Sequence, residues 1–239
     1  MGVKRGAAER APRAVEAGAD LRVPAATAAR IVGRYRRFSH RSYVRCKLRW
    51  DPLFAAVAPL LSASPRRLLD IGCGLGLLGQ YLRECGFRGE YLGLDLDAHK
   101  IEEARFASQQ GELDLEFSNG SAETVPAAFR GDVALLDVLH YLPAAMQRRV
   151  LDESAKRVGD GGMIVIRNVL RDRSWRFHAT VAEENFSRVL GWMTPVGHFP
   201  AREEIESPLR AAGLEVRTRP LWGRTPFNSY LIVGRRASS

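Results

Sequence analysis

The sequence predicts an α/β protein in which helices cover both faces of a mainly parallel sheet. Over most of the chain, short apolar strand-like segments alternate with amphipathic helical segments, as a doubly wound sheet requires. Near the C-terminus this alternation stops. The strand-like residues 214–218 and 230–233 are joined by a stretch that contains Pro220, Gly223 and Pro226 and has no helical period. Without a crossover helix these two strands should pair antiparallel. The predicted fold is therefore a parallel sheet finished by an antiparallel hairpin.

The individual elements follow from short apolar runs and from the 3.6-residue period. The predicted strands are 67–71, 91–94, 115–117, 132–136, 163–167, 214–218 and 230–233. The predicted helices between them are a segment ending at Cys85 and residues 98–110, 144–158 and 203–212. Gly213 closes the last helix, as glycine commonly does.

A basic helical region precedes the sheet. Residues 1–22 mix Ala, Gly, Arg and Pro without apolar periodicity, and we expect a disordered tail there. From Pro24 to about Asp51 the pattern is that of one amphipathic helix, and residues 53–61 form a second, short helix. The expected apolar stripe consists of Ile31, Tyr35, Phe38, Ser42 and Cys46, and the expected basic stripe of Arg30, Arg34, Arg37, Arg41, Arg45 and Arg49. Ser64-Pro65 is a natural boundary between this region and the sheet.

The excess positive charge is confined to this region. The formal net charge is +9, but residues 1–50 alone hold thirteen Lys or Arg and three Asp or Glu. The remainder holds 23 basic and 24 acidic residues, which leaves it close to neutral. A field limited to one arm indicates local contact with an anionic partner. An ordinary solvated face in an arginine-rich composition explains the same pattern.

Composition and cysteine usage limit the class of protein. No apolar run approaches the length of a membrane span, and the N-terminus lacks the apolar stretch of a secretory signal. Three cysteines without clustered spacing fit reduced thiols better than a disulfide framework or a zinc site. We therefore expect a soluble cytoplasmic protein without a metal centre.

A glycine-rich turn after the first strand carries the clearest chemical signal. Gly72, Gly74 and Gly76 lie between that strand and a helix, where a residue without Cβ lets the backbone approach a ligand closely. Free N–H groups at the helix start can meet polar ligand groups. Asp95 ends the second strand, where its carboxylate can accept both hydroxyls of a ribose.

These motifs resemble the class I S-adenosylmethionine-dependent methyltransferases over about residues 65–239. The resemblance implies a Rossmann-like sheet of seven strands and S-adenosyl-L-methionine as the cofactor. It also implies a set of cofactor-binding residues, namely Asp70 at the methionine end, Gly72, Cys73, Gly74 and Gly76 along the cofactor, Asp95 and Leu96 at the ribose, Ser121 and Ala122 at the adenine, and Asp137 near the reacting methyl group. The family often has Asp where this chain has Ser121, so adenine contact is expected from the backbone of Ala122 rather than from the Ser121 side chain.

The implied reaction is an in-line transfer of the methyl group to an oxygen, nitrogen or carbon atom of a small molecule. His140 and Tyr141 are the candidate catalytic residues, with His140 either a general base or a packing residue. His178 and His198 are weaker candidates. Small-molecule members of the family often have an N-terminal helical lid, here residues 23–64, and an insertion after the fifth strand, where this chain has Trp175, Phe177, Phe186 and Trp192. A fainter similarity to the methyltransferases of aryl-polyene pigment clusters implies a substrate carried by an acidic acyl carrier protein.

Three alternatives remain open at this point. An RNA methyltransferase would use the basic arm, although the near-neutral remainder and the lack of an Asn/Asp-Pro-Pro-Tyr/Phe motif after the fourth strand argue against nucleic acid. An NAD(P)-dependent oxidoreductase would explain the G-x-G-x-x-G pattern at 74–79. Against it stand the acidic Asp70 at the strand end, the antiparallel finish, and the Tyr43-x-x-x-Lys47 pair, which copies a short-chain dehydrogenase pair but precedes the glycine turn rather than following it. The third alternative is a non-catalytic partner protein that binds the cofactor.

Overall fold

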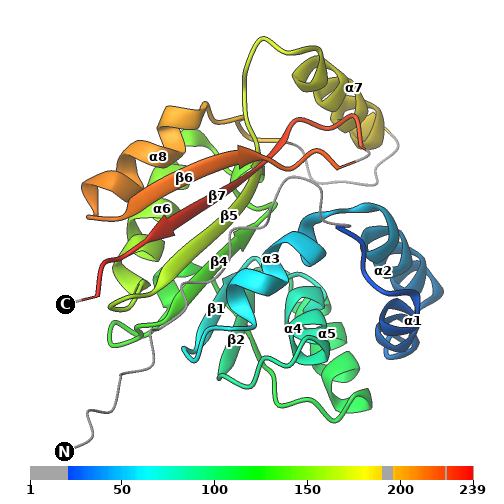
Figure 1. The fold of residues 1–239 in the computed structure, drawn as a ribbon. Coiled ribbons are helices and arrows are strands. Elements are labelled where there is room, and N and C mark those ends of the chain that lie inside the picture. The colour runs from blue at the N-terminus through cyan, green and yellow to red at the C-terminus, as the bar shows by residue number, and fades with distance from the viewer. Residues whose placement is uncertain (1–20, 190–195, 224, 239) are drawn as a thin grey trace, which may run out of the picture.

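The computed structural model describes residues 21–189, 196–223 and 225–238, with no side chains described for 183–189. In this part of the chain, one sheet of seven strands runs in the order β3-β2-β1-β4-β5-β7-β6 (Figure 1). The strands are β1 (Leu68–Ile71), β2 (Tyr91–Asp95), β3 (Glu116–Asn119), β4 (Asp132–Leu136), β5 (Met163–Val169), β6 (Glu215–Pro220) and β7 (Ser229–Arg235).

The sheet is parallel from β3 to β5 and antiparallel at its C-terminal end. β1 pairs parallel with β2 and β4, β2 with β3, and β4 with β5. β7 enters between β5 and β6 and pairs antiparallel with both. The predicted fold class, including the antiparallel hairpin, is confirmed.

Helices cover both faces of this sheet. They are α1 (Ala25–Gly33), α2 (Phe38–Trp50), α3 (Leu53–Leu61), α4 (Leu77–Glu84), α5 (Ala98–Gln110), α6 (Ala144–Arg157), α7 (Trp175–Val189) and α8 (Arg202–Ala211). Strand side chains alternate between two cores, so that Leu68 packs with α3, α4 and α5 while Leu69 packs with α6 and α8. α7 follows β5 and lies beyond the carboxyl ends of the parallel strands, at the same end of the molecule as α2 (Figure 1).

The prediction of one continuous helix from Pro24 to Asp51 is wrong. The chain leaves helical geometry between α1 and α2, and Arg37 is extended (φ −77°, ψ 137°). Ile31 and Tyr35 are buried as expected, but the second helix buries Val44 and Leu48 in place of the predicted Phe38 and Cys46. The apolar stripe therefore does not continue past the break, because α2 is turned about its own axis so that different sequence positions face the core.

The N-terminal helices are fastened to α4 and α5 by arginines. Arg34 donates to the carboxylate of Glu84 (2.5 Å) and to the amide oxygen of Gln80 (2.7 Å). Arg30 reaches the other oxygen of Glu84, and Arg36 contacts the buried carboxylate of Glu103 at 3.2 Å. Part of the basic region is thus neutralised within the molecule. The predicted tail, residues 1–22, falls almost entirely outside the described residues.

None of the helices that the structure describes has the length and the apolar character needed to cross a bilayer.

Candidate functional site

The glycine turn after β1 is shaped by three glycines with positive φ, and each has a different surrounding. A Cβ on Gly72 (φ +76°) would collide with the side chain of Val138, and one on Gly76 (φ +72°) would collide with Phe117. A Cβ on Gly74 (φ +54°) would meet nothing within 4 Å. Gly72 and Gly76 therefore permit tight packing, whereas Gly74 borders open space in which a ligand can approach the backbone.

Asp95, at the carboxyl end of β2, is held by the backbone around it. Its Oδ2 accepts the N–H of Gly74 at 2.8 Å, and its Oδ1 accepts the N–H of Asp97 at 2.9 Å. The side chain is half-buried. Because a carboxylate oxygen can accept two hydrogen bonds, each of the two oxygens can still accept one from a further donor. The geometry gives a fixed carboxylate beside the open space at Gly74, as recognition of two adjacent hydroxyls requires.

The side chains of Asp70 and Cys73 are buried beneath the glycine turn. Asp70 is 2% exposed, and Tyr91 donates its hydroxyl to Asp70 Oδ2 at 2.5 Å. Burial raises the pKa of Asp70 to about 7, against the opposing effect of the Tyr91 hydrogen bond. Burial also raises the pKa of the Cys73 thiol well above its usual range, which makes this cysteine a poor nucleophile.

The loops after β2 and β3 form the next part of the rim. Leu96 is 72% exposed beside Asp95. The hydroxyl of Ser121 accepts the N–H of Glu123 at 3.3 Å, so this side chain caps a short 3₁₀ turn. Ala122, the first residue of the same turn, is buried. The Ser121 side chain is thus engaged locally, as expected if the backbone makes the ligand contact there.

Four charged side chains meet at the carboxyl ends of β4 and β5. Lys47 Nζ of α2 lies 3.0 Å from Asp51 Oδ2 and 3.2 Å from Asp137 Oδ2. Arg167 of β5 donates to the same oxygen of Asp137, and its other terminal nitrogen is 3.7 Å from Asp51. These residues, Lys47, Asp51, Asp137 and Arg167, are called the charge quartet below. It joins the N-terminal region to the end of the sheet.

Asp137 is the strained member of the quartet. Its φ is +62°, a left-handed conformation that non-glycine residues adopt rarely. Although burial opposes ionisation, the charges of Arg167 and Lys47 hold the pKa of Asp137 well below its usual range. One of its oxygens, Oδ1, is buried and has no hydrogen-bond partner among the described residues. The quartet therefore offers an ionised carboxylate with one oxygen that can still accept a hydrogen bond. This carboxylate is close to the glycine turn, because the next residue, Val138, packs against Gly72.

His140 is buried and oriented by Asn168. Asn168 Nδ2 donates to the carbonyl of Val169 (2.8 Å), which leaves its Oδ1 facing the Nδ1 of His140 at 3.0 Å. Since that oxygen can only accept, Nδ1 carries a proton, and in the neutral ring the lone pair lies on Nε2. Burial lowers the pKa of His140 against the opposing effect of Asp137, which favours the neutral form. This protonation state is the one that a general base needs.

Aromatic rings surround the imidazole. The rings of Tyr141 and His140 are 4.1 Å apart, and Phe199 stacks at 6.3 Å with an interplanar angle of 7°. Phe177 of α7 meets Phe199 edge-to-face at 5.4 Å. The candidate catalytic residues His140 and Tyr141 are therefore brought together with an aromatic wall from the insertion after β5.

The imidazoles of the two other histidine candidates are turned elsewhere. The backbone N–H of His198 donates to the carbonyl of His140 at 3.2 Å, but its Nε2 lies 3.1 Å from Glu204 near the start of α8. His178 is exposed on α7. Trp192 and the side chain of Phe186 lie outside the described residues. Among the residues described, no group of three or more His, Cys, Asp or Glu is arranged to hold a metal ion.

Sequence reasoning missed most of the quartet and the partner of His140. Lys47 was noticed only as part of a Tyr-x-x-x-Lys pattern, and its partner Asp137 is ninety residues away. Arg167 gave one signal, a cation that closes an otherwise apolar strand. Asn168, which orients His140, gave none.

Comparison with known proteins identifies relatives along most of the chain. Residues 40–219 match the family model described as a methyltransferase domain. A ubiquinone biosynthesis O-methyltransferase of Sinorhizobium medicae is 32% identical over 187 residues, which are 71% of this chain and 73% of that protein. The mitochondrial protein of the same description from Candida albicans is 29% identical over 142 residues, 58% of this chain but only 42% of its own length.

Solved structures share the fold. A magnesium protoporphyrin IX methyltransferase from Synechocystis PCC 6803, determined with bound SAH, has a TM-score of 0.63 at 17% identity and covers 89% of this chain and 94% of its own. An O-methyltransferase family protein from Burkholderia thailandensis has a TM-score of 0.58 at 24% identity and covers 79% of this chain and 59% of its own.

Proposed function

The chain belongs to the methyltransferase-domain family, and from this premise we propose that it methylates a hydroxyl oxygen of a small aromatic molecule. Its cofactor is S-adenosylmethionine, which when bound supplies a methyl group activated on a sulfonium. The oxygen acceptor is supported by the relatives, which are named O-methyltransferases of ubiquinone biosynthesis.

The residues at the carboxyl edge of the sheet fit the nucleoside part of this cofactor. The open space at Gly74 is a cradle that a Cβ would fill. The carboxylate of Asp95, fixed by two backbone N–H groups, is suited to accept the two ribose hydroxyls. Leu96, exposed beside it, offers an apolar surface to the adenine, with Ser121 and Ala122 on the next loop.

The charge quartet fits the amino-acid part. A methionyl group carries one ammonium and one carboxylate, and both need partners when they leave water. In our proposal Lys47 binds the carboxylate, and Asp137 accepts from the ammonium through its unpartnered Oδ1. Arg167 keeps Asp137 ionised for this role.

The observation that carries the hydroxyl acceptor is the fixed tautomer of His140. A neutral imidazole whose Nδ1–H is held by Asn168 could take the acceptor's proton on Nε2 as the methyl carbon exchanges its bond to the sulfonium sulfur for one to the acceptor oxygen, which would leave a neutral thioether. The rings of Tyr141, Phe199 and Phe177 beside it would pack against an aromatic acceptor and exclude water. Alignment and exclusion of water are the remaining contributions of the protein.

Three further parts of the proposal come from the sequence. We infer that residues 23–64 act as a lid, since Lys47 of this region meets Asp137 at the site. We place the reaction in the cytoplasm, where the free thiols of Cys46, Cys73 and Cys85 would stay reduced. An acidic carrier protein for the acceptor stays a prediction.

The test is methyl transfer from labelled S-adenosylmethionine to catechol, 3,4-dihydroxybenzoic acid, a low-molecular-weight cell extract and total RNA. We expect label on the hydroxyl of small molecules. The His140→Ala variant should lower turnover about 100-fold or more without changing cofactor affinity, and Asn168→Ala should lower it less, since it removes only the orientation of the ring. The matched control is His99→Ala, because His99 is exposed on α5. Label found in RNA alone, or on nitrogen or carbon alone, would overturn the proposal.

A further inference from the structure

The arginines of the N-terminal region divide into two groups. Arg30, Arg34 and Arg36 point toward α4 and α5, where Arg30 and Arg34 share the carboxylate of Glu84 and Arg36 pairs with Glu103. The second group lies in and beside α2 and is exposed; it consists of Arg37, Arg41, Arg45 and Arg49. None of these four forms an ion pair with a carboxylate among those that the structure describes; Arg41 donates to the backbone carbonyl of Tyr35. Among the described residues of this region, the arginines without a carboxylate partner therefore lie in and beside α2.

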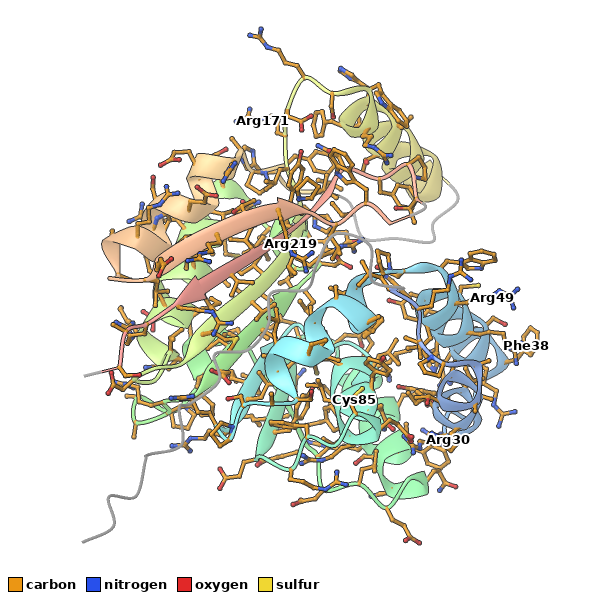
Figure 2. The ribbon with its side chains drawn as sticks, in the orientation of Figure 1. Arg30, Phe38, Arg49, Cys85, Arg171 and Arg219 are labelled. Carbon is orange, nitrogen blue, oxygen red and sulfur yellow. The ribbon has the colours of Figure 1, made fainter. Side chains whose placement is uncertain are left out.

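The exposed side of α2 also carries large aromatic residues. Phe38 at its start is 82% exposed and Trp50 at its end is 62% exposed, so these rings stand about 18 Å apart along the helix. The guanidinium of Arg49 lies over the Trp50 ring at 5.0 Å. Figure 2 shows Phe38 and Arg49 on the outer side of the N-terminal helices, away from the sheet. The sequence from Phe38 to Trp50 contains no Asp or Glu.

We propose that this surface, the outer side of α2 with Phe38, Arg41, Arg45, Arg49 and Trp50, docks the protein on an anionic lipid bilayer. Guanidinium groups bind phosphate through paired hydrogen bonds, and an acid-free basic helix is drawn to a negatively charged surface. Aromatic rings that stand apart between arginines suit the headgroup layer, where tryptophan and phenylalanine side chains gain from partial insertion.

An acidic carrier protein is the rival occupant, and the spacing of the aromatic rings favours the bilayer. The interface of a protein partner usually has a contiguous, dehydrated centre. On α2, by contrast, Phe38 and Trp50 lie at opposite ends with the arginines between them.

The docking surface is independent of the site chemistry but close to it. α2 presents Lys47 to the charge quartet and its arginines to the outside. A molecule docked through the outer side of α2 would therefore hold the acceptor side of the sheet near the bilayer.

The experiment is vesicle co-sedimentation of the full chain. Vesicles of phosphatidylcholine alone are compared with vesicles of phosphatidylcholine and phosphatidylglycerol in equal parts. We expect binding to the anionic vesicles only, weakened by salt. The double variant Arg45→Gln with Arg49→Gln should lower the partition coefficient about 30-fold, because each arginine contributes a factor of about five. Phe38→Ala with Trp50→Ala should lower it about tenfold or more, with the salt dependence retained.

The matched control is Arg149→Gln with Arg217→Gln, which removes the same charge from exposed positions on α6 and β6 and should leave binding unchanged. An equal loss in this control would reduce the effect to net charge and overturn the proposal. Binding to soluble polyglutamate but not to vesicles would overturn it in favour of an acidic protein. Methylation of catechol in the absence of vesicles should persist in every variant, so failure of docking and failure of the proposed function are distinguishable.

Discussion

Lys47 offers the sharpest test of how the cofactor is held. Lys47→Met keeps the aliphatic part of the side chain and removes the ammonium that lies 3.0 Å from Asp51 and 3.2 Å from Asp137. In our proposal its loss deprives the methionyl carboxylate of a charge-assisted hydrogen bond, which contributes about 1.5–3 kcal/mol. S-adenosylhomocysteine contains this carboxylate, whereas 5′-methylthioadenosine contains the same nucleoside without the amino-acid group.

The assay is therefore calorimetric titration of both ligands. With Lys47→Met, the dissociation constant of S-adenosylhomocysteine should rise about 10- to 150-fold, while that of 5′-methylthioadenosine should change by less than about twofold. Lys47→Arg should recover part of the loss, and Lys156→Met, at an exposed position on α6, should change neither constant. Equal weakening of both ligands would mean that Lys47 acts only by holding the fold together, and no weakening would refute its role.

Three further predictions follow from single contacts. Asp95→Ala should weaken 5′-methylthioadenosine and S-adenosylhomocysteine alike by about 1–3 kcal/mol in titration, and wild-type affinity for both would refute ribose binding by this carboxylate. Tyr35→Phe removes the buried hydrogen bond to the carbonyl of Leu75 (2.9 Å) and should lower the free energy of unfolding in urea by about 1–3 kcal/mol, whereas Tyr43→Phe at a half-exposed position should not; equal effects would contradict the role of that bond. Burial raises the pKa of Asp70 to about 7, so the folded state prefers the neutral carboxyl. The resulting contribution to the free energy of unfolding is fully present below about pH 4 and is lost as the pH rises through about 7. The loss amounts to up to roughly 4 kcal/mol. Asp70→Asn should flatten this dependence in urea titrations at pH 5 and pH 8, and an unchanged pH dependence would contradict the assignment.

The sheet was predictable because its signals are local. The predicted bounds of α3, α5 and β4 coincide with the observed ones, since their apolar patterns begin and end at clear turn residues. The antiparallel end was predictable for a similar reason, because the chain between β6 and β7 lacks a helical period.

The break between α1 and α2 was not predictable from periodicity. Tyr35 is drawn into the core by its hydrogen bond to Leu75, forty residues away, and α2 then buries Val44 instead of Phe38. The continuous pattern of arginines extended the predicted helix across this point, because a helical period in sequence carries no information on contacts made later in the chain.

At the candidate site, the sequence suggested positions but not their environments. The glycine turn, Asp95 and His140 were proposed from local motifs. The environments that determine their chemistry come from distant residues: Asn168 orients His140 from 28 positions away, and Lys47 approaches Asp137 across ninety. Long-range contacts of this kind exist only after the sheet has formed.

The attachment of the N-terminal helices to α4 and α5 has a consequence for biosynthesis. Arg30 is neutralised by Glu84, 54 residues later, and Arg36 by Glu103, 67 residues later. At a translation rate of roughly 5–20 residues per second, the interval from Arg36 to Glu103 lasts roughly 3–13 s. During this time the emerging helices have their arginines but lack the acids and the apolar surface that α4 and α5 later provide. This segment therefore leaves the ribosome before α4 and α5 but docks only after β1, β2 and these two helices have been made.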